Sequence, residues 1–343
     1  MIKTGIIGYG FSAQTFHLPF IKHLNEFELT AISSSKSEQV LADNPGMQVY
    51  DTAEQLIKDN TTELVIITSP NDTHYDLAKL ALANGKHVIV EKPFVTQVAQ
   101  GEELIALAKE KELVLSTYHN RRWDGDFLTI QQIIESKALG EIRVFESHFD
   151  RFRPISRQRW REQAGEGTGI WYDLGSHLVD QALCLFGWPK AITACCRALR
   201  ENSQVTDYFH VQLHYPNHEV VLCSSPFSAG PGLRFQLEGT KGSFVKYGLD
   251  PQEDQLKQGR GPASENWARE VEAKHGMLFQ EDKEAIYPTL LGGYQHYFSN
   301  IAQAIKHNKT VAVTAEQALA VINIIQLAER SSAMGQTIPL LNE

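Results

Sequence analysis

An acidic residue and a histidine stand four positions apart near the middle of the chain, at Asp173 and His177. In a helix, two side chains with this spacing share one face. A carboxylate can orient a neighbouring imidazole, and the imidazole can exchange a proton near neutral pH because histidine titrates around pH ~6.5. A plain structural role fits equally, with Asp173 as the N-cap of a helix whose leucines pack inward. The segment alone leaves both interpretations open.

A glycine motif near the N-terminus indicates a second kind of chemistry. An apolar run from Lys3 is followed by Gly8-Tyr9-Gly10-Phe11-Ser12-Ala13, which has the spacing G-x-G-x-x-A. The first glycine permits a tight turn, the second lets the backbone approach a pyrophosphate, and a small third residue lets the helix pack closely on the strand. The motif predicts a dinucleotide-binding turn, although an ordinary strand-turn-helix unit explains it as well.

The residues that follow the second expected strand, 27–33, bear on the choice of cofactor. NAD enzymes usually carry Asp or Glu at this strand end, since a carboxylate binds the ribose hydroxyls and repels a 2′-phosphate. Here the chain has Ser34, Ser35 and Lys36. Hydroxyl groups and a cation suit a phosphate, so we predict NADP, with NAD as the alternative. A serine-rich N-cap for a helix that begins near Glu38 is the structural alternative.

Alternating strands and helices must position these residues. After the glycine motif we expect strands at 64–68, 87–91 and 114–118, and helices at 52–59, 73–83 and 97–111. Such alternation makes a parallel sheet with helices on both faces, and ligands bind beyond its carboxyl ends. Polar segments occur at three of those ends, at 68–74, 91–93 and 119–122. Each of these segments alone also fits a turn, a strand exit or a surface pair.

The alternation stops after Arg122. A helix is expected at 126–136, followed by strands at 141–149, 191–199, 207–215, 219–225, 233–238 and 243–247. Consecutive strands without helices between them make a mainly antiparallel sheet. Residues 252–284 are expected to form a long loop with one helical turn, and helices at 294–306 and 315–330 to pack back toward the first domain.

The predicted fold is therefore an α/β Rossmann dinucleotide-binding domain, residues 1–120, and an α+β domain with a large, mainly antiparallel open sheet, residues 121–343. A length of 343 residues supports two domains, because a single core usually stops growing at ~250 to 300 residues. The net charge of -9 argues against a nucleic-acid surface. No apolar run reaches the ~20 residues of a membrane span, and no signal peptide is evident, so we expect a cytoplasmic protein.

The cysteine and histidine patterns show no sign of a metal site. The four cysteines have no C-x-x-C pair and no disulfide-framework spacing, so we predict buried structural thiols. No histidine cluster has the spacing of a zinc site. We therefore predict no metal.

Taken in order, these motifs resemble the Gfo/Idh/MocA family of pyridine-nucleotide-dependent sugar and polyol oxidoreductases. The resemblance extends over essentially the whole chain and rests on Gly8-x-Gly10-x-x-Ala13, Thr68-x-Pro70-Asn71-x-x-His74, Glu91-Lys92-Pro93 and Asp173-x-x-x-His177. Segments 118–124, 148–154, 159–162 and 247–254 look like the branch with NADP-dependent scyllo-inositol dehydrogenases. Lys36 stands where NADP-preferring relatives often have arginine, which weakens the expected discrimination against NAD.

The resemblance implies a catalytic set of Lys92, Asp173 and His177. We expect His177 to be the principal acid/base, Asp173 to orient it and Lys92 to polarise the reacting oxygen, although Lys92 and His177 can exchange roles. The implied cofactor contacts are Gly8, Gly10, Phe11, Ser12, Ser34, Ser35, Lys36, Thr68, Pro70, Asn71, His74, Glu91, Lys92, Asn120, Trp160 and Arg161. Arg122 and Tyr294 are expected at the substrate, with packing as the alternative for Tyr294.

The predicted function is hydride transfer between NADP and a secondary alcohol or ketone of a cyclic polyol or sugar. The resemblance also implies a homodimer through the exposed face of the second-domain sheet. Two alternatives stand beside this prediction. One is a non-catalytic dinucleotide-binding sensor on the same fold, since fold does not determine function. The other is a reductase of a different sugar or of another carbonyl compound.

Overall fold

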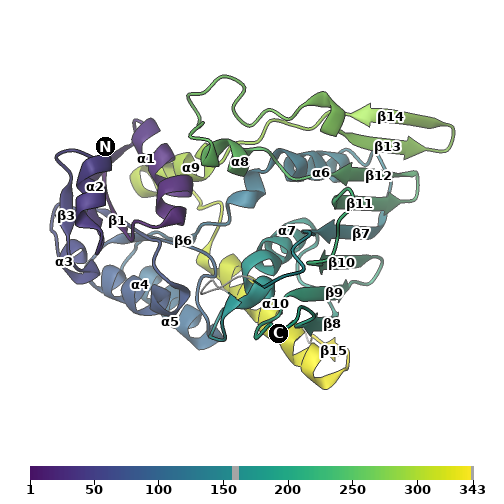
Figure 1. Cartoon of the computed structure of the whole chain (residues 1–343), viewed down its shortest axis with the longest axis horizontal. Coiled ribbons are helices and arrows are strands. Elements are labelled where there is room, and N and C mark those ends of the chain that lie inside the picture. Colours follow the sequence, from purple (N-terminus) through teal and green to yellow (C-terminus); the bar gives the residue numbers. More distant parts are fainter. Residues whose placement is uncertain (157–161, 341–343) are drawn as a thin grey trace. The chain divides into compact units, whose positions relative to one another are not determined.

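The computed structural model describes residues 1–156 and 162–340, which divide into two compact units (Figure 1). Unit 1 comprises Met1–Trp123, Pro251–Ala268 and Gly293–Ile322. Unit 2 comprises the described parts of Asp124–Asp250, Arg269–Gly292 and Asn323–Glu343. Unit 1 thus includes two later segments that the sequence analysis assigned to the second domain.

Unit 1 is built on a six-stranded parallel sheet. Its strands are β1 (Ile2–Ile7), β2 (Phe27–Ser33), β3 (Gln48–Tyr50), β4 (Leu64–Ile67), β5 (His87–Val90) and β6 (Leu115–Thr117). Their order is β3-β2-β1-β4-β5-β6, and every pair is parallel. This is the strand order of dinucleotide-binding folds. The predicted Rossmann domain is confirmed, with the short β3 as an unexpected edge strand.

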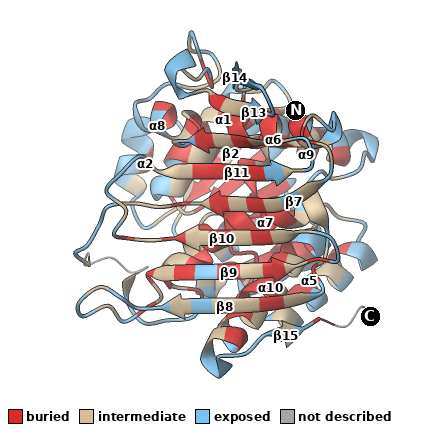
Figure 2. Ribbon diagram, turned by 90° about the vertical axis from the view of Figure 1, so that its right-hand side faces the viewer, coloured by how far each residue is buried: buried red, intermediate tan, exposed pale blue. Residues whose placement is uncertain are grey.

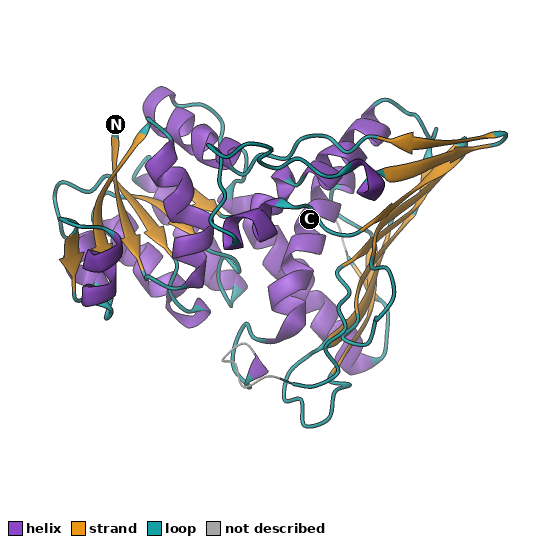
Figure 3. Ribbon diagram, turned by 45° about the horizontal axis from the view of Figure 1, so that its top comes forward, coloured by secondary structure: helices purple, strands orange, loops and turns teal. Residues whose placement is uncertain are grey.

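Helices cover both faces of this sheet (Figure 3). The helices of unit 1 are α1 (Leu18–His23), α2 (Ser37–Asp43), α3 (Ala53–Ile57), α4 (His74–Ala83), α5 (Val98–Glu110), α8 (Gln252–Lys257) and α9 (Gln295–His307). One core cluster joins α1 and α9 to the sheet through Phe20, Tyr297 and Phe298. Another joins α4 and α5 to the opposite face through Leu82 and Leu104. Burial on both faces explains why β4 reads as an unbroken apolar run.

Unit 2 contains a nine-stranded mixed sheet. Its strands are β7 (Ile142–His148), β8 (Ala191–Arg197), β9 (Tyr208–His214), β10 (Glu219–Ser224), β11 (Leu233–Gly239), β12 (Gly242–Tyr247), β13 (Gly276–Gln280), β14 (Lys283–Tyr287) and β15 (Ile338–Pro339). The order is β14-β13-β12-β11-β7-β10-β9-β8-β15. Strands β7 and β10 pair in parallel and the other pairs are antiparallel. The predicted mainly antiparallel sheet is confirmed.

Only one face of this sheet is covered by helices in the part of the chain that the structure describes (Figure 3). Burial alternates along the strands (Figure 2), so that Val220 and Leu222 of β10 are buried while their neighbours Val221 and Cys223 are partly exposed. Helices α6 (Gly125–Glu135) and α7 (Ser176–Phe186) belong to this unit, and α10 (Ala315–Met334) begins in unit 1 and ends in unit 2. Dimerisation through the uncovered face stays a prediction.

Segment 252–284 has the one helical turn that was predicted, but the rest of it is not the expected long loop. It contains α8 and, farther along, the hairpin of β13 and β14, which pairs with β12 at the end of the sheet. Nearly every residue of β14 is exposed, so no apolar alternation marks it in the sequence. Backbone pairing with an existing edge creates these strands. Gly276 pairs with Tyr287 in this hairpin, and it must be small because a Cβ there would lie 2.2 Å from the ring of Phe244.

The prediction of buried cysteines was also wrong. Cys184 and Cys195 are exposed, Cys196 and Cys223 are half-buried, and all four are free thiols. Cys195 and Cys223 both lie opposite His210 and thus share one face of the sheet, the face that the helices leave uncovered. No helix among the described residues has the length and apolarity needed to span a bilayer. Within the same residues, no cluster of three or more His, Cys, Asp or Glu side chains could hold a metal.

Candidate active site

The glycine motif forms the turn between β1 and the first helix of unit 1. Gly8 has a φ of +97°, and a Cβ there would lie 2.8 Å from the hydroxyl oxygen of Thr68. At Gly10 a Cβ would meet no atom within 4 Å, which leaves open space beside the backbone. Ala13 is fully buried where helix and sheet meet. These three environments match the separate requirements of a dinucleotide turn, so the residues present fit such a cofactor.

The residues expected to read the ribose lie just beyond the end of β2. Ser35 and Lys36 are exposed, and the hydroxyl of Ser34 accepts a hydrogen bond of 3.0 Å from the backbone N–H of Lys36. The N-cap of α2 is Lys36, and it makes no side-chain capping bond. The serine-rich N-cap considered above is therefore wrong, which leaves the exposed hydroxyl of Ser35 and the ammonium of Lys36 facing solvent.

Residues after β4 form a loop that His74 ties to the end of β5. Thr68 donates its hydroxyl proton to the carbonyl of Ile7 at 2.8 Å, which joins this loop to β1. Asn71 begins a short 3-10 turn after the exposed Pro70. His74 is fully buried, with Nδ1 2.7 Å from the carbonyl oxygen of Pro93 and Nε2 3.1 Å from that of Ser69. Burial lowers the pKa of His74. Its ring therefore joins two strand-end loops.

The carboxylate of Glu91 is the acceptor for several donors in the interior of unit 1. Ser12 Oγ and His17 Nε2 both bond to Glu91 Oε1, the latter at 2.8 Å. The backbone N–H of Lys92 donates to Oε2 at 3.1 Å. Burial opposes ionisation of Glu91, but the bonds from His17 and Ser12 outweigh it and hold the pKa at about 2. Glu91 and Ser12, both expected to contact the cofactor, are thus bonded to one another.

The other expected residues of unit 1 differ in burial and in hydrogen-bond partners. Lys92 is half-buried and Asn120 is buried. Arg122 donates to the carbonyl of Ala312 at 2.8 Å and to the side chain of Gln317 at 2.9 Å. Tyr294 is fully buried in the core of unit 1, with its ring 6.4 Å from that of Phe20. This burial fits the packing alternative, and a substrate contact of Tyr294 stays a prediction.

Asp173 and His177 lie on one continuous helix of unit 2. Its backbone is already in the right-handed helical conformation at Ile170, three residues before Asp173, so the alternative that made Asp173 the N-cap is wrong. Asp173 instead lies inside a π turn, Trp171–Gly175, and α7 follows directly. The Asp173 side chain is partly exposed, and His177 is 7 % exposed. Single π turns inside helices are frequent at functional sites.

Gly175 has a packing role within this π turn. A Cβ at Gly175 would lie 2.2 Å from the indole of Trp171, which is fully buried. The indole N–H of Trp171 donates to the carbonyl of Ile325 at 3.0 Å. Gly175 is thus small because the tryptophan ring covers it. The two remaining expected contacts, Trp160 and Arg161, lie outside the described residues.

His17, which is fully buried and bonded to Glu91, was not among the residues predicted from the sequence. One signal was available in the first helix. His17 falls on the apolar face that Ala13, Phe20 and Ile21 define, and a histidine on such a face needs a polar partner inside the protein. The partner stands 74 residues later at the end of β5, a separation that no local pattern reveals.

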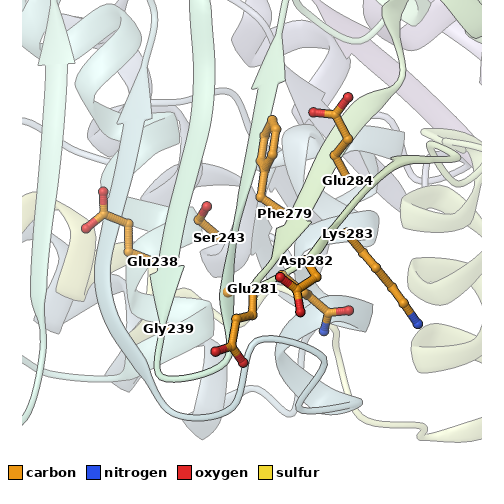
Figure 4. A pocket seen from close by; sticks show the side chains of 10 residues that line it. Glu238, Gly239, Ser243, Phe279, Glu281, Asp282, Lys283 and Glu284 are labelled. Atoms are coloured by element: carbon orange, nitrogen blue, oxygen red, sulfur yellow. The ribbon is translucent and has the colours of Figure 1, made fainter.

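A polar hollow exists elsewhere in unit 2 (Figure 4). It lies between the turn that joins β11 to β12 and the turn that joins β13 to β14. Four carboxylates line it, on Glu238, Glu281, Asp282 and Glu284. None of the expected site residues lines this hollow.

Comparisons with known proteins identify the family. Residues 2–119 match the family model described as "Oxidoreductase family, NAD-binding Rossmann fold", and residues 131–340 match "Oxidoreductase family, C-terminal alpha/beta domain". The chain belongs to the Gfo/Idh/MocA family of oxidoreductases. The resemblance stated from its motifs is therefore confirmed, and the protein is an oxidoreductase with an NAD-binding domain.

Individual relatives match over nearly their full length. The uncharacterized oxidoreductase YdgJ of Escherichia coli is 45% identical, with 99% of each chain covered. The scyllo-inositol 2-dehydrogenase (NADP(+)) IolW of Bacillus subtilis is 41% identical, with 99% of this chain and 96% of the relative covered. The solved structure of the yvaA oxidoreductase from Bacillus subtilis matches with a TM-score of 0.96 at 40% identity, over 99% of both chains.

Proposed function

We propose that the protein is an NADP-preferring dehydrogenase that transfers hydride between the nicotinamide and a secondary alcohol of a cyclic polyol, with scyllo-inositol or a close stereoisomer as substrate. The observation that carries this proposal is the full-length similarity to a relative named as an NADP-dependent scyllo-inositol 2-dehydrogenase. The residues Lys92, Asp173 and His177, which the proposed chemistry requires, are all present in this chain.

The preference for NADP is supported by the end of β2. Ser34, Ser35 and Lys36 supply two hydroxyls and one ammonium, and no acidic residue stands between 33 and 37. A carboxylate at this position would repel a 2′-phosphate, whereas an exposed ammonium attracts one. Lysine acts as a point charge without the planar fork of arginine, so NAD is expected to remain a weaker second cofactor.

The proposed chemistry divides the work among three residues. Bound NADP would accept the hydride from the alcohol carbon. His177 would take the hydroxyl proton as the carbonyl forms, and Asp173, one turn earlier on the same helix, would orient its ring. Lys92 would donate a hydrogen bond to the reacting oxygen. Lys92 comes just after the end of β5, and ligands bind beyond the carboxyl ends of the strands of a parallel sheet.

A substrate panel tests the proposal. The purified chain would be supplied with NADP or NAD and, in turn, with scyllo-, myo- and chiro-inositol and with several aldoses, while reduced nicotinamide is followed by absorbance. We expect the highest kcat/KM for an inositol with NADP. Failure of every polyol, together with reduction of simple carbonyl compounds by NADPH, would replace the proposal with a carbonyl reductase.

A further inference from the structure

Unit 1 buries a histidine and a carboxylate against each other, next to the proposed catalytic lysine. His17 is fully buried and Glu91 is 9 % exposed, and His17 Nε2 lies 2.8 Å from Glu91 Oε1. A buried carboxylate without donors is costly, because it loses its water shell. The chain therefore supplies donors to it from two different elements, the first helix and the end of β5.

The two oxygens of Glu91 face different parts of the unit. Oε1 accepts from Ser12 Oγ and from His17 Nε2, which both belong to the first helix. Oε2 accepts from the backbone N–H of Lys92, at 3.1 Å. The carboxylate thus bridges the helix and the main chain of the residue that the proposed reaction needs. We call these three groups, Ser12, His17 and Glu91, the carboxylate clip.

The first helix is shaped to make this bridge. Ser12 and His17 are five residues apart, a spacing that would place them about 140° apart around a regular α-helix. The segment Ala13–His17 is a π turn, in which residues five apart come onto one face. The π turn therefore allows both side chains to reach the same oxygen of Glu91.

Aromatic rings hold His17 in place. Its ring centroid lies 4.5 Å from that of Tyr118 and 5.8 Å from that of Phe298, and these two rings belong to β6's end and to α9. The imidazole therefore cannot swing away to solvent as a surface residue would. Its orientation is set by packing, as expected for a group that positions another.

We propose that His17 and Glu91 are positioning residues for Lys92, which fix its main chain so that its side chain reaches the reacting oxygen. This inference rests on the proposed function only in giving Lys92 its role with the substrate. It assigns Ser12 and Glu91, which the resemblance placed among the cofactor contacts, to holding the lysine. It also assigns a role to His17, which no motif indicated.

Hydrogen exchange tests the clip without substrate or cofactor. The exchange rate of the Lys92 amide would be compared in the wild type, His17→Phe and His17→Gln, with the Val88 amide of β5 as the internal reference. His17→Phe keeps a planar ring but removes the donor, so we expect exchange at Lys92 to rise about tenfold. In His17→Gln the new side-chain amide can still donate, and the rate should stay within about threefold of the wild type.

Unchanged exchange at Lys92 in His17→Phe would overturn the proposal. If that variant fails to fold, Ser12→Ala serves instead, because it removes one donor from a partly exposed position. We then expect a smaller increase, about threefold, at Lys92 alone. An equal increase at Val88 would indicate general loosening and would also overturn the proposal.

Kinetics separate positioning from mere stability. With the best substrate of the panel, His17→Phe should lower kcat about tenfold or more, while KM and the dissociation constant of NADPH stay within about twofold. His17→Gln should restore most of kcat. An unchanged kcat in His17→Phe, or equal losses in both variants, would contradict the proposal.

The two proposals can fail separately. A wild type that is inactive on every polyol would contradict the proposed function, whereas the hydrogen-exchange experiment would still test the carboxylate clip.

Discussion

Each unit contains a helix interrupted by one π turn, and the two turns do different work. In unit 1 the turn Ala13–His17 brings two donors onto a single carboxylate. In unit 2 the turn Trp171–Gly175 lays an indole over a glycine, and the helix then carries a buried histidine, His177. The same local irregularity thus organises a charge in one unit and an aromatic ring in the other. The structural role of each π turn depends on the residues that pack against it.

The largest effect should come from removing one proposed catalytic residue from each unit. Separate Lys92→Ala and His177→Ala variants should lower kcat by about two to four orders of magnitude, since each loses a group that handles the reacting oxygen or its proton. Steady-state kinetics would measure this, with NADPH titration as the control for an intact cofactor site. Near-normal turnover in either variant would confine the chemistry to the other unit.

Acid sensitivity should distinguish the carboxylates of the two units. Despite burial, hydrogen bonds from His17 and Ser12 hold the pKa of Glu91 at about 2. A lowered pKa stabilises the fold above the unfolded value near ~4.3, and this contribution is lost as pH falls from there to about 2. Across that window the wild type should lose on the order of 3 kcal/mol more unfolding free energy than Glu91→Gln, measured by urea denaturation.

Glu329 of unit 2 is the matched control, because its pKa shift predicts the opposite change of stability as pH falls. Burial raises its pKa, although it accepts a bond of 3.3 Å from the hydroxyl of Tyr172. A raised carboxyl pKa makes the folded state bind its proton more tightly than the unfolded state does. Relative to Glu329→Gln, the wild type should therefore gain stability as pH falls through the folded pKa. If unfolding free energy changed in the same direction for both glutamates as pH falls, the contrast between the units would be contradicted.

The glycine turn of unit 1 and the π turn of unit 2 should also respond differently to an added methyl group. In Gly175→Ala the Cβ would press on the ring of Trp171, so we expect a loss of about 1–3 kcal/mol in unfolding free energy. In Gly10→Ala the Cβ meets open space, so stability should be kept while NADPH binds more weakly. Denaturation and cofactor titration on both variants would check this. Equal stability losses would remove the distinction.

The smallest expected effect concerns the choice of cofactor, which lies within unit 1. Lys36→Asp should lower the ratio of kcat/KM for NADP to that for NAD about tenfold, as an ammonium that binds a phosphate is replaced by a repelling carboxylate. Lys58→Asp, at an exposed position after α3, is the control and should leave the ratio unchanged. An unaltered preference in Lys36→Asp would exclude Lys36 as the reader of the 2′-phosphate.

Local sequence patterns predict much of the dinucleotide-binding unit. Strand β2 was predicted with its observed bounds, Phe27–Ser33, because apolar and polar residues alternate along most of its length. The turn at Gly8 and Gly10 was predicted from the G-x-G-x-x-A spacing, and the φ of +97° at Gly8 is a conformation that favours glycine. By contrast, β13 and β14 carry few buried side chains, so only pairing with β12 reveals them.

The sequence by itself determined the family, the nucleotide fold and the candidate residues Lys92, Asp173 and His177, because these depend on short motifs and local periodicity. Only the tertiary structure decided that Asp173 lies inside a π turn, that Trp171 requires the glycine at 175, and that Glu91 is held by His17. The physical reason is the range of the interactions. Turn and strand preferences act over a few residues, whereas the partner of a buried charge depends on which strand end packs against which helix.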